Sequence, residues 1–174
     1  MTAPNVTFVL GGARSGKSLF AENKTAESGK EKIYVATAQA WDDEMRERIA
    51  LHRSRRSADW TTVDAPMDLV GALKTHVRTT TIVLVDCLTL WLSNLITADH
   101  DLNAATEDLA GHLREKSGSI VLVSNEVGLG IVPENALARR FRDAQGRLNQ
   151  QFAARAGRVA FVAAGLPLWL KGGS

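Results

Sequence analysis

The segment that most constrains the fold is "GGARSGKS", residues 11–18. It matches the pattern G-x-x-x-x-G-K-[ST], follows the apolar run "VTFVL" (6–10) and opens a helical pattern that extends to about residue 27. In this context glycines let backbone N–H groups converge on phosphate oxygens, and the helix N-terminus adds partial positive charge. The alternative is a glycine-rich turn that binds nothing. We favour a phosphate-binding loop because the pattern and its strand–helix context coincide.

Apolar runs that resemble strands alternate with helical patterns along the whole sequence. Strands are expected at residues 6–10, 32–38, 60–63, 81–86, 119–124 and 158–164. Helices are expected at 17–27, over the acidic-to-basic stretch 42–56, and at 67–77, 88–96, 104–116 and 135–156. Such alternation is typical of βαβ units. We therefore predict one α/β domain over residues 1–174, with a mainly parallel sheet flanked by helices.

An acid at the end of a neighbouring strand is the second feature of a triphosphate site. Mg²⁺ bound with a nucleotide takes oxygen ligands from the loop hydroxyl and from such an acid. Asp86 ends the apolar run "TIVLVD". We predict Ser18 and Asp86 as Mg²⁺ ligands and Lys17 as the cation that reaches the β- and γ-phosphates. The alternative for Asp86 is a turn residue at a strand end.

Composition limits the other partners. A formal net charge of +2 is too small to indicate nucleic-acid binding by itself, but it suits a small anionic ligand. The single cysteine, Cys87, cannot form an intrachain disulfide or a cysteine-rich metal site, which is typical of a reducing compartment. The first residues lack the basic region of a signal peptide, and the longest apolar run, residues 159–170, is too short to span a bilayer. We expect a cytoplasmic protein with no membrane segment and no nucleic-acid partner.

Four segments together resemble one enzyme family. They are "GGARSGKS", "YVATAQAWDDEMRERIALHR", "VDCLTLWLSNL" and "SNEVGLGIVPENALARRFRDAQGRLNQ". In this order they resemble the bifunctional adenosylcobinamide kinase/adenosylcobinamide-phosphate guanylyltransferases of cobalamin biosynthesis. The resemblance extends from Val9 to about Lys171, and the last segment is its most specific part.

The resemblance implies a P-loop sheet of the RecA type, a homotrimer and two reactions. In the first, ATP or GTP phosphorylates the aminopropanol hydroxyl of adenosylcobinamide. In the second, GMP passes from GTP to adenosylcobinamide phosphate, giving adenosylcobinamide-GDP and pyrophosphate. The resemblance places a covalent GMP intermediate on the histidine of "RIALHR", which is His52. Some relatives carry two adjacent histidines where this chain has Leu51-His52, and the stretch 97–118 is shorter here than in some of them.

The resemblance also implies a set of nucleotide contacts. They are Gly11, Gly12, Ala13, Arg14, Ser15, Gly16, Lys17 and Ser18 of the loop, Ala36, Thr37 and Ala38 after the second strand, Arg53, Ser54, Arg55 and Arg56 after the histidine, Asp64 and Asp86. Among them, Arg53, Arg55 and Arg56 have the charge to neutralise a leaving pyrophosphate. The alternative for these arginines is a solvated basic helix face.

His52 has a structural alternative as well. Met45, Ile49 and His52 are spaced four and three apart, so the histidine continues an apolar stripe of a helix. A neutral imidazole is also a good nucleophile toward an α-phosphate. One rival to the bifunctional enzyme is therefore a single-activity P-loop kinase with a structural His52.

The second rival is a nucleotide-gated switch or binding module. Such a module should carry N-K-x-D, but "NKTA" (23–26) fails at its fourth position. It should also carry D-x-x-G after a strand, whereas "DAQG" (143–146) lies inside a predicted helix. We favour the bifunctional enzyme over both rivals.

Overall fold

The computed structural model describes residues 3–40, 43–114 and 118–173. The strands are β1 Ala3–Gly11, β2 Glu31–Ala36, β3 Trp60–Asp64, β4 Thr81–Asp86, β5 Ser119–Asn125, β6 Ala156–Ala163 and β7 Leu166–Lys171. The helices are α1 Lys17–Ala26, α2 Asp43–Arg55, α3 Leu69–His76, α4 Leu88–Thr97, α5 Leu102–Arg114 and α6 Ala136–Arg155. Every helix and strand expected from the sequence is present, with ends that differ by a few residues.

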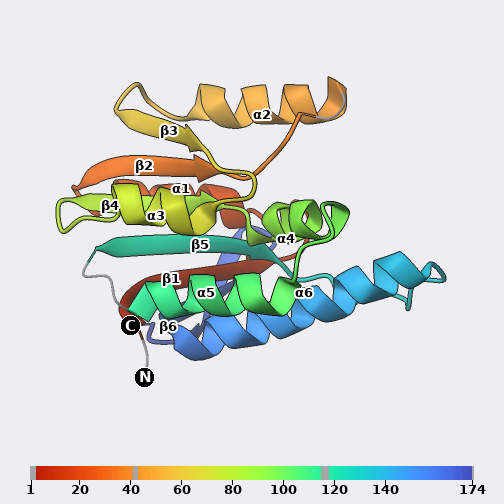
Figure 1. The fold of residues 1–174 in the computed structure, drawn as a ribbon. Coiled ribbons are helices and arrows are strands. Elements are labelled where there is room, and N and C mark those ends of the chain that lie inside the picture. The colour runs from red at the N-terminus through yellow and green to blue at the C-terminus, as the bar shows by residue number, and fades with distance from the viewer. Residues whose placement is uncertain (1–2, 41–42, 115–117, 174) are drawn as a thin grey trace.

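The strands form one seven-stranded sheet in the order β3-β2-β4-β5-β1-β6-β7 (Figure 1). All neighbouring pairs are parallel except β6 and β7. β5 lies between β1, which leads into the phosphate loop, and β4, which ends in Asp86. This insertion of a strand is the arrangement of RecA-type P-loop proteins, so the predicted fold class is confirmed.

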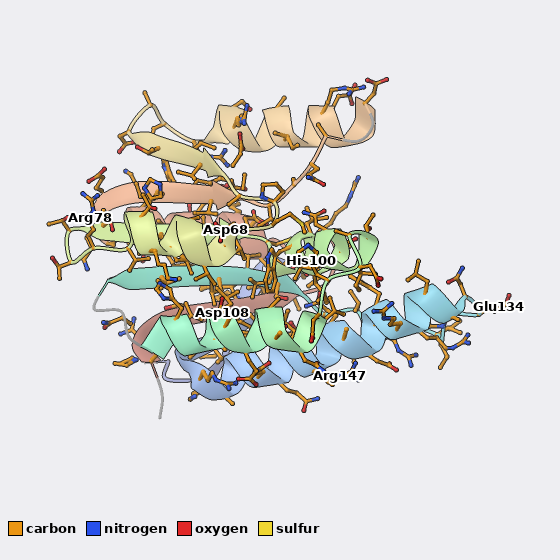
Figure 2. The ribbon with its side chains drawn as sticks, in the orientation of Figure 1. Asp68, Arg78, His100, Asp108, Glu134 and Arg147 are labelled. Carbon is orange, nitrogen blue, oxygen red and sulfur yellow. The ribbon has the colours of Figure 1, made fainter. Side chains whose placement is uncertain are left out.

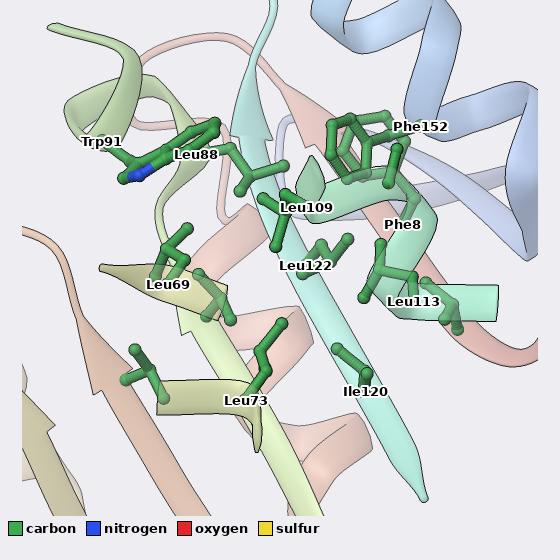
Figure 3. Close-up of a cluster of buried hydrophobic side chains, with 14 of the residues drawn as sticks. Phe8, Leu69, Leu73, Leu88, Trp91, Leu109, Leu113, Ile120, Leu122 and Phe152 are labelled. Atoms are coloured by element: carbon green, nitrogen blue, oxygen red, sulfur yellow. The ribbon is translucent and has the colours of Figure 1, made fainter. Parts of the chain in front are cut away.

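Helices cover both faces of the sheet because the central strands are apolar on both sides. One face packs on α3, α4, α5 and α6, whose buried side chains form the larger hydrophobic cluster together with strand residues such as Phe8 and Leu122 (Figure 3). The other face packs on α1, where Ala21 joins Val9, Leu84 and Val123. Charged side chains such as Arg78, Asp108 and Arg147 lie on the outer surface (Figure 2). The sheet is thus the middle layer of a three-layer structure.

Helix α2 is the exception to this packing. It lies beyond β3 at the edge of the sheet (Figure 1). None of its described residues belongs to either hydrophobic cluster. Ile49, which the sequence places on an apolar stripe, is half-buried, and Leu51 is 53% exposed. The side chains of Met45 and His52 lie outside the described part of the structure.

The sequence analysis missed β7. Residues 158–164 were expected to close the fold as a final strand, but β6 and β7 form an antiparallel hairpin with Ala163 opposite Leu166. The two connecting residues, Ala164 and Gly165, have φ of 51° and 78°, and two positive φ values are what a tight type I′ hairpin turn requires. Ala-Gly lacks the Asn-Gly or Asp-Gly signal of such turns, so the sequence showed only a continuous apolar run.

The second strand also ends earlier than expected. It was predicted to continue to Ala38, but β2 ends at Ala36. The next residue, Thr37, donates its hydroxyl to the carbonyl of Cys87 and accepts the Cys87 N–H, both at 2.8 Å. These two bonds connect the residue after β2 to the end of β4, so the chain leaves the strand at this point.

Among the residues that the structure describes, no helix combines the length and the apolar character that crossing a bilayer requires.

The fold predicts an unreactive thiol at Cys87. Cys87 lies between β4 and α4 and is buried. Burial, followed by the negative charge of Asp86, raises the pKa of the thiol to about 11. Because the thiolate is the reactive form, we expect the native protein to resist iodoacetamide at pH 8. Mass spectrometry should find one alkylated residue only after unfolding in guanidinium. Fast labelling of the native protein would mean that this junction opens.

Candidate active site

The predicted site residues gather at one edge of the sheet because the strands are parallel. Ala36 lies opposite both Asp64 and Asp86 in the strand register. Gly11, at the end of β1, lies opposite Asn125 at the end of β5. The carboxyl ends of β1, β2, β3 and β4 therefore bring the phosphate loop, both aspartates and the segment after β2 to the same edge. This is the edge where open α/β sheets bind ligands.

Gly16 sets the geometry of the phosphate loop. Its φ of 92° is a left-handed conformation that favours glycine, and it forms the N-cap of α1 without a side-chain cap. A Cβ atom here would also lie 2.9 Å from the Cα of Gly165. The first turn of α1 therefore presents backbone N–H groups that no capping side chain occupies, as an anion-binding helix start requires.

Gly11 is required for a different reason. A Cβ atom on Gly11 would lie 2.5 Å from the carbonyl oxygen of Val162 and would also strike the Ser15 hydroxyl. The Gly165 N–H donates to the Ser15 carbonyl at 2.8 Å, so the β6–β7 turn holds the loop from the outside. Among the described residues, the buried Ser15 Oγ has no hydrogen-bond partner. The loop is therefore packed closely from behind and retains an unsatisfied oxygen, which suits a polar ligand.

Lys17 is held inside the loop. Its ammonium donates to the carbonyl of Gly12 at 3.2 Å, and the residue is 9% exposed. Gly12 is half-buried, Ala13 and Arg14 are exposed, and Arg14 adopts a φ of 56°. The loop thus places one positive charge at its centre with solvent access across residues 12–14, which is the arrangement that a nucleotide triphosphate needs.

Asp86 is held by a neighbouring tyrosine. The Tyr34 hydroxyl donates to Asp86 Oδ2 at 3.1 Å. Burial, followed by the charge of Asp86, raises the pKa of Tyr34, so its hydroxyl stays protonated and remains a donor. Asp86 and the half-buried Ser18 supply carboxylate and hydroxyl oxygens, the hard donors that Mg²⁺ prefers. These two residues have the donor chemistry that would hold a Mg²⁺ ion.

Thr37 connects the segment after β2 to α4. It is fully buried, and its carbonyl accepts a hydrogen bond of 2.9 Å from Asn94 Nδ2. The flanking Ala36 and Ala38 are half-buried. Of this predicted contact segment, Thr37 is a structural support, whereas its neighbours lie where a ligand at the sheet edge can meet them.

The residues after His52 separate into two groups. Arg53 and Asp64 form an ion pair of 3.5 Å with side chains 55% and 70% exposed, so both are accessible from solvent. Ser54 is exposed and donates its hydroxyl to the carbonyl of Leu51. The side chain of Arg55, like that of His52, lies outside the described part of the structure.

Arg56 differs from these residues because its side chain is buried. Its guanidinium lies 3.5 Å from the centroid of the Tyr34 ring. It also forms an ion pair of 3.7 Å with Glu22 of α1, and the two side chains are 5% and 8% exposed. A buried pair of this kind is costly to break, because removal of one partner leaves an uncompensated charge. The contacts of Arg56 are therefore internal, in contrast to those of Arg53.

A buried polar network beside the phosphate loop was not found from the sequence. Ser124 donates to Asn149 Oδ1, and Gln145 donates to both. Asn149 also donates to the carbonyl of Asn125, and the Asn125 N–H donates to the hydroxyl of Thr89. These bonds join the two ends of the segment 124–150, the most specific part of the family resemblance. The only sequence signal was the presence of uncharged polar residues on the apolar face of a long helix.

A separate pocket lies elsewhere among the described residues. It has a volume of about 270 Å³ and lies between the α4–α5 connection and α6, with His100, Arg140 and Arg147 among its lining residues. None of the predicted nucleotide contacts lines it. The pocket is therefore separate from the phosphate loop.

Comparison with known proteins gives one consistent family. The family described as cobinamide kinase/cobinamide phosphate guanyltransferase matches residues 7–170. The bifunctional adenosylcobalamin biosynthesis protein CobP of Pseudomonas aeruginosa is 51% identical over 94% of this chain and 96% of its own length. The bifunctional adenosylcobalamin biosynthesis protein CobU of Escherichia coli is 38% identical over 94% of this chain and 98% of its own length.

A solved structure from Pyrococcus horikoshii OT3 shares the fold alone, with a TM-score of 0.58, 9% identity, and coverage of 100% of this chain and 89% of that one. The family match covers nearly the whole chain and includes the phosphate loop, the segment after β2, Asp86 and the polar network. The chain belongs to the cobinamide kinase/cobinamide phosphate guanylyltransferase family.

Proposed function

We propose that this protein phosphorylates adenosylcobinamide and then transfers GMP to the product through His52. Adenosylcobinamide and its phosphate are the acceptors, and ATP or GTP is the donor. The observation that carries the proposal is the phosphate loop, whose glycines, lysine and helix start have the geometry of a triphosphate site at the same sheet edge as Asp86. The homotrimer and the cytoplasmic location stay predictions.

In the kinase reaction, the loop residues 11–18 hold the donor triphosphate. Lys17 exchanges its contact with the Gly12 carbonyl for the β- and γ-phosphate oxygens, where it neutralises developing charge. The acceptor hydroxyl attacks the γ-phosphorus, its proton is released, and the nucleoside diphosphate leaves. The residues of the protein contribute position and charge, and no covalent enzyme intermediate is needed.

In the guanylyl transfer, a ring nitrogen of His52 attacks the α-phosphorus of GTP and pyrophosphate leaves. An oxygen of adenosylcobinamide phosphate then attacks the same phosphorus, the P–N bond breaks, and the imidazole is restored. Covalent catalysis divides one transfer into two in-line steps. Arg53 and Arg55 are proposed to neutralise pyrophosphate, with Ser54 and Asp64 as further contacts.

We propose Ser18 and Asp86 as the protein ligands of Mg²⁺. When bound, the ion neutralises phosphate charge and orients the triphosphate. Tyr34 holds Asp86 through one carboxylate oxygen, which fixes the direction of the carboxylate. The buried contacts of Arg56 favour a role other than the nucleotide contact predicted from the sequence.

The first prediction concerns the phosphate loop. Lys17→Ala should lower the rates of both reactions, because both need a held triphosphate. The loss of one preorganised charge typically costs roughly 10²–10³ in rate. Steady-state assays of each reaction measure the effect, with the exposed Lys74→Ala on α3 as the matched control. Near-normal turnover of a folded Lys17→Ala variant would contradict the assignment of the loop.

The second prediction concerns the metal. Asp86→Asn replaces a carboxylate ligand with a neutral amide, so a higher Mg²⁺ concentration should be needed for half-maximal activity. A Mg²⁺ titration of the kinase reaction measures the change. Asp108→Asn, an exposed change on α5, is the control. Superimposable titration curves for Asp86→Asn and the native protein would remove Asp86 from the metal shell.

The third prediction concerns the nucleophile. His52→Asn should take up no label from GTP labelled at the α-phosphate, while it retains much of the kinase activity. In the native protein the label should survive alkali and be lost in acid, because a P–N bond to histidine is acid-labile. His76→Asn on α3 is the control. Full labelling of His52→Asn would place GMP on another residue, and absence of labelling in the native protein would support the single-activity kinase.

A further inference from the structure

Helix α2 carries the proposed nucleophile, and the residues of it that the structure describes do not pack on the core. None of its described residues joins either hydrophobic cluster. Helices of globular proteins are usually stabilised by burial of an apolar face, so a helix without one depends on contacts near its ends. Among the described residues, the carboxyl end of α2 is held by the exposed ion pair of Arg53 with Asp64 and by the buried contacts of Arg56.

Arg56 makes the buried contacts at the carboxyl end of α2. Its backbone N–H donates to the carbonyl of Arg53 at 3.2 Å, which attaches it directly to the last turn. Its guanidinium lies on the Tyr34 ring of β2 at 3.5 Å and pairs with Glu22 of α1 at 3.7 Å. A planar guanidinium can stack flat on a ring and still direct its N–H groups at a carboxylate, whereas an ammonium has no plane to stack. One side chain thus joins α2 to the sheet and to the phosphate-loop helix.

Tyr34 extends the connection to the proposed metal ligand. The face of its ring contacts Arg56, while its hydroxyl donates to Asp86 Oδ2 at 3.1 Å. A continuous series of contacts therefore extends from the end of α2 through Arg56 and Tyr34 to the Asp86 carboxylate. The ion pair with Glu22 connects Arg56 to α1 as well.

We propose that Arg56, Glu22 and Tyr34 form a positioning link that orients the histidine-bearing helix α2 relative to the phosphate-loop helix and to Asp86. Arg56 is thereby a positioning residue and not a nucleotide contact. This inference rests on the proposed roles of His52 and Asp86. The side chain of Arg53 is 55% exposed and suits a ligand contact, whereas that of Arg56 is 5% exposed and suits the link.

The main test separates the two reactions. Arg56→Lys keeps the charge but loses the planar stack, so α2 should be held less accurately. Misplacement of a reacting group by about 1 Å can cost roughly 100-fold in rate, so we expect GMP labelling to slow by roughly 10- to 100-fold, with the kinase rate changed by under about threefold. A purely structural role would lower both rates together, in proportion to the folded fraction. Equal losses in the two reactions would therefore overturn the proposal.

A second variant guards against misfolding and tests the rival role of Arg56. The double variant Glu22→Gln/Arg56→Gln removes both buried charges together, so no unpaired charge remains. In a link, the effects of Glu22→Gln and Arg56→Gln on the labelling rate are non-additive, because each single change already breaks the pair. A nucleotide contact by Arg56 would instead raise the KM for GTP in both reactions, and its effect would add to that of Glu22→Gln. That result would overturn the link.

The matched control is the ion pair Arg155–Glu107, which joins α6 to α5 at 3.1 Å. Arg155→Gln/Glu107→Gln should leave both rates unchanged. A labelling defect in this control equal to that of the Arg56 variants would show a general sensitivity to lost ion pairs and would overturn the link.

Tyr34→Phe tests the connection to Asp86. The variant keeps the ring under Arg56 but loses the hydrogen bond to the carboxylate. Loss of a partner that orients a metal ligand typically costs 10- to 100-fold in metal affinity, so the Mg²⁺ requirement should rise by roughly tenfold. An unchanged Mg²⁺ titration would overturn this part of the link.

Failure of the link differs from failure of the proposed function. Native protein and His52→Asn are labelled in parallel with the link variants. If the native protein takes up label and His52→Asn does not, the proposed function stands whatever the Arg56 variants show. If the native protein takes up no label, or if His52→Asn is labelled as fully as the native protein, the assignment of His52 as the nucleophile fails, whatever the link variants show.

Discussion

The close packing of backbone against backbone behind the phosphate loop is the constraint on which the site depends. A side chain at Gly11 would collide with the Val162 carbonyl, and one at Gly16 would collide with Gly165. Glycine at both positions therefore lets β6 and the β6–β7 turn pack directly against the loop, where the Gly165 N–H donates to the Ser15 carbonyl. Because β6 pairs with β1, the strand that leads into the loop also holds the element that supports it. The triphosphate site is thus a product of sheet assembly and not of the loop alone.

The parallel sheet then decides which chemical groups meet. It places the ends of β1, β2 and β4 at one edge, and the side chains that cross between these ends fix one another. Thr37 ties the end of β2 to Cys87, and Tyr34 of β2 donates to Asp86 of β4. Beside the loop, the buried network around Asn149 holds the end of β5. Buried polar groups are costly unless hydrogen-bonded, so their concentration at this edge indicates that rigidity there serves function.

The proposed nucleophile, His52, lies on a helix whose described residues do not pack on the core, in contrast to the buried groups at the sheet edge. Helix α2 lies beyond the edge strand β3 (Figure 1). In the sheet, β3 is four strand spacings from β1, which is about 19 Å at the usual spacing. The proposed guanylyl transfer through His52 requires this side chain to meet an α-phosphate, so the placement of α2 relative to the loop matters more for that step than the stability of the helix itself. The buried contact region among the described residues, where Arg56 meets Tyr34 and Glu22, joins α2 to the phosphate-loop side of the sheet. In the proposed mechanism the kinase reaction uses the sheet edge alone, and the transfer of GMP uses the edge and α2.

The sequence by itself determined the order and kind of the elements, because apolar periodicity and the P-loop pattern are local signals. It also predicted a phosphate loop at residues 11–18, since the glycine positions needed for positive φ and close approach are visible in the pattern. It could not reveal the β6–β7 hairpin, whose Ala-Gly turn carries no strong signal, or the early end of β2, which depends on hydrogen bonds to Cys87. Only the tertiary structure separated Arg53 from Arg56, which are alike in sequence. The physical reason is that burial and pairing arise between α1, β2 and the end of α2, segments whose proximity no local pattern encodes.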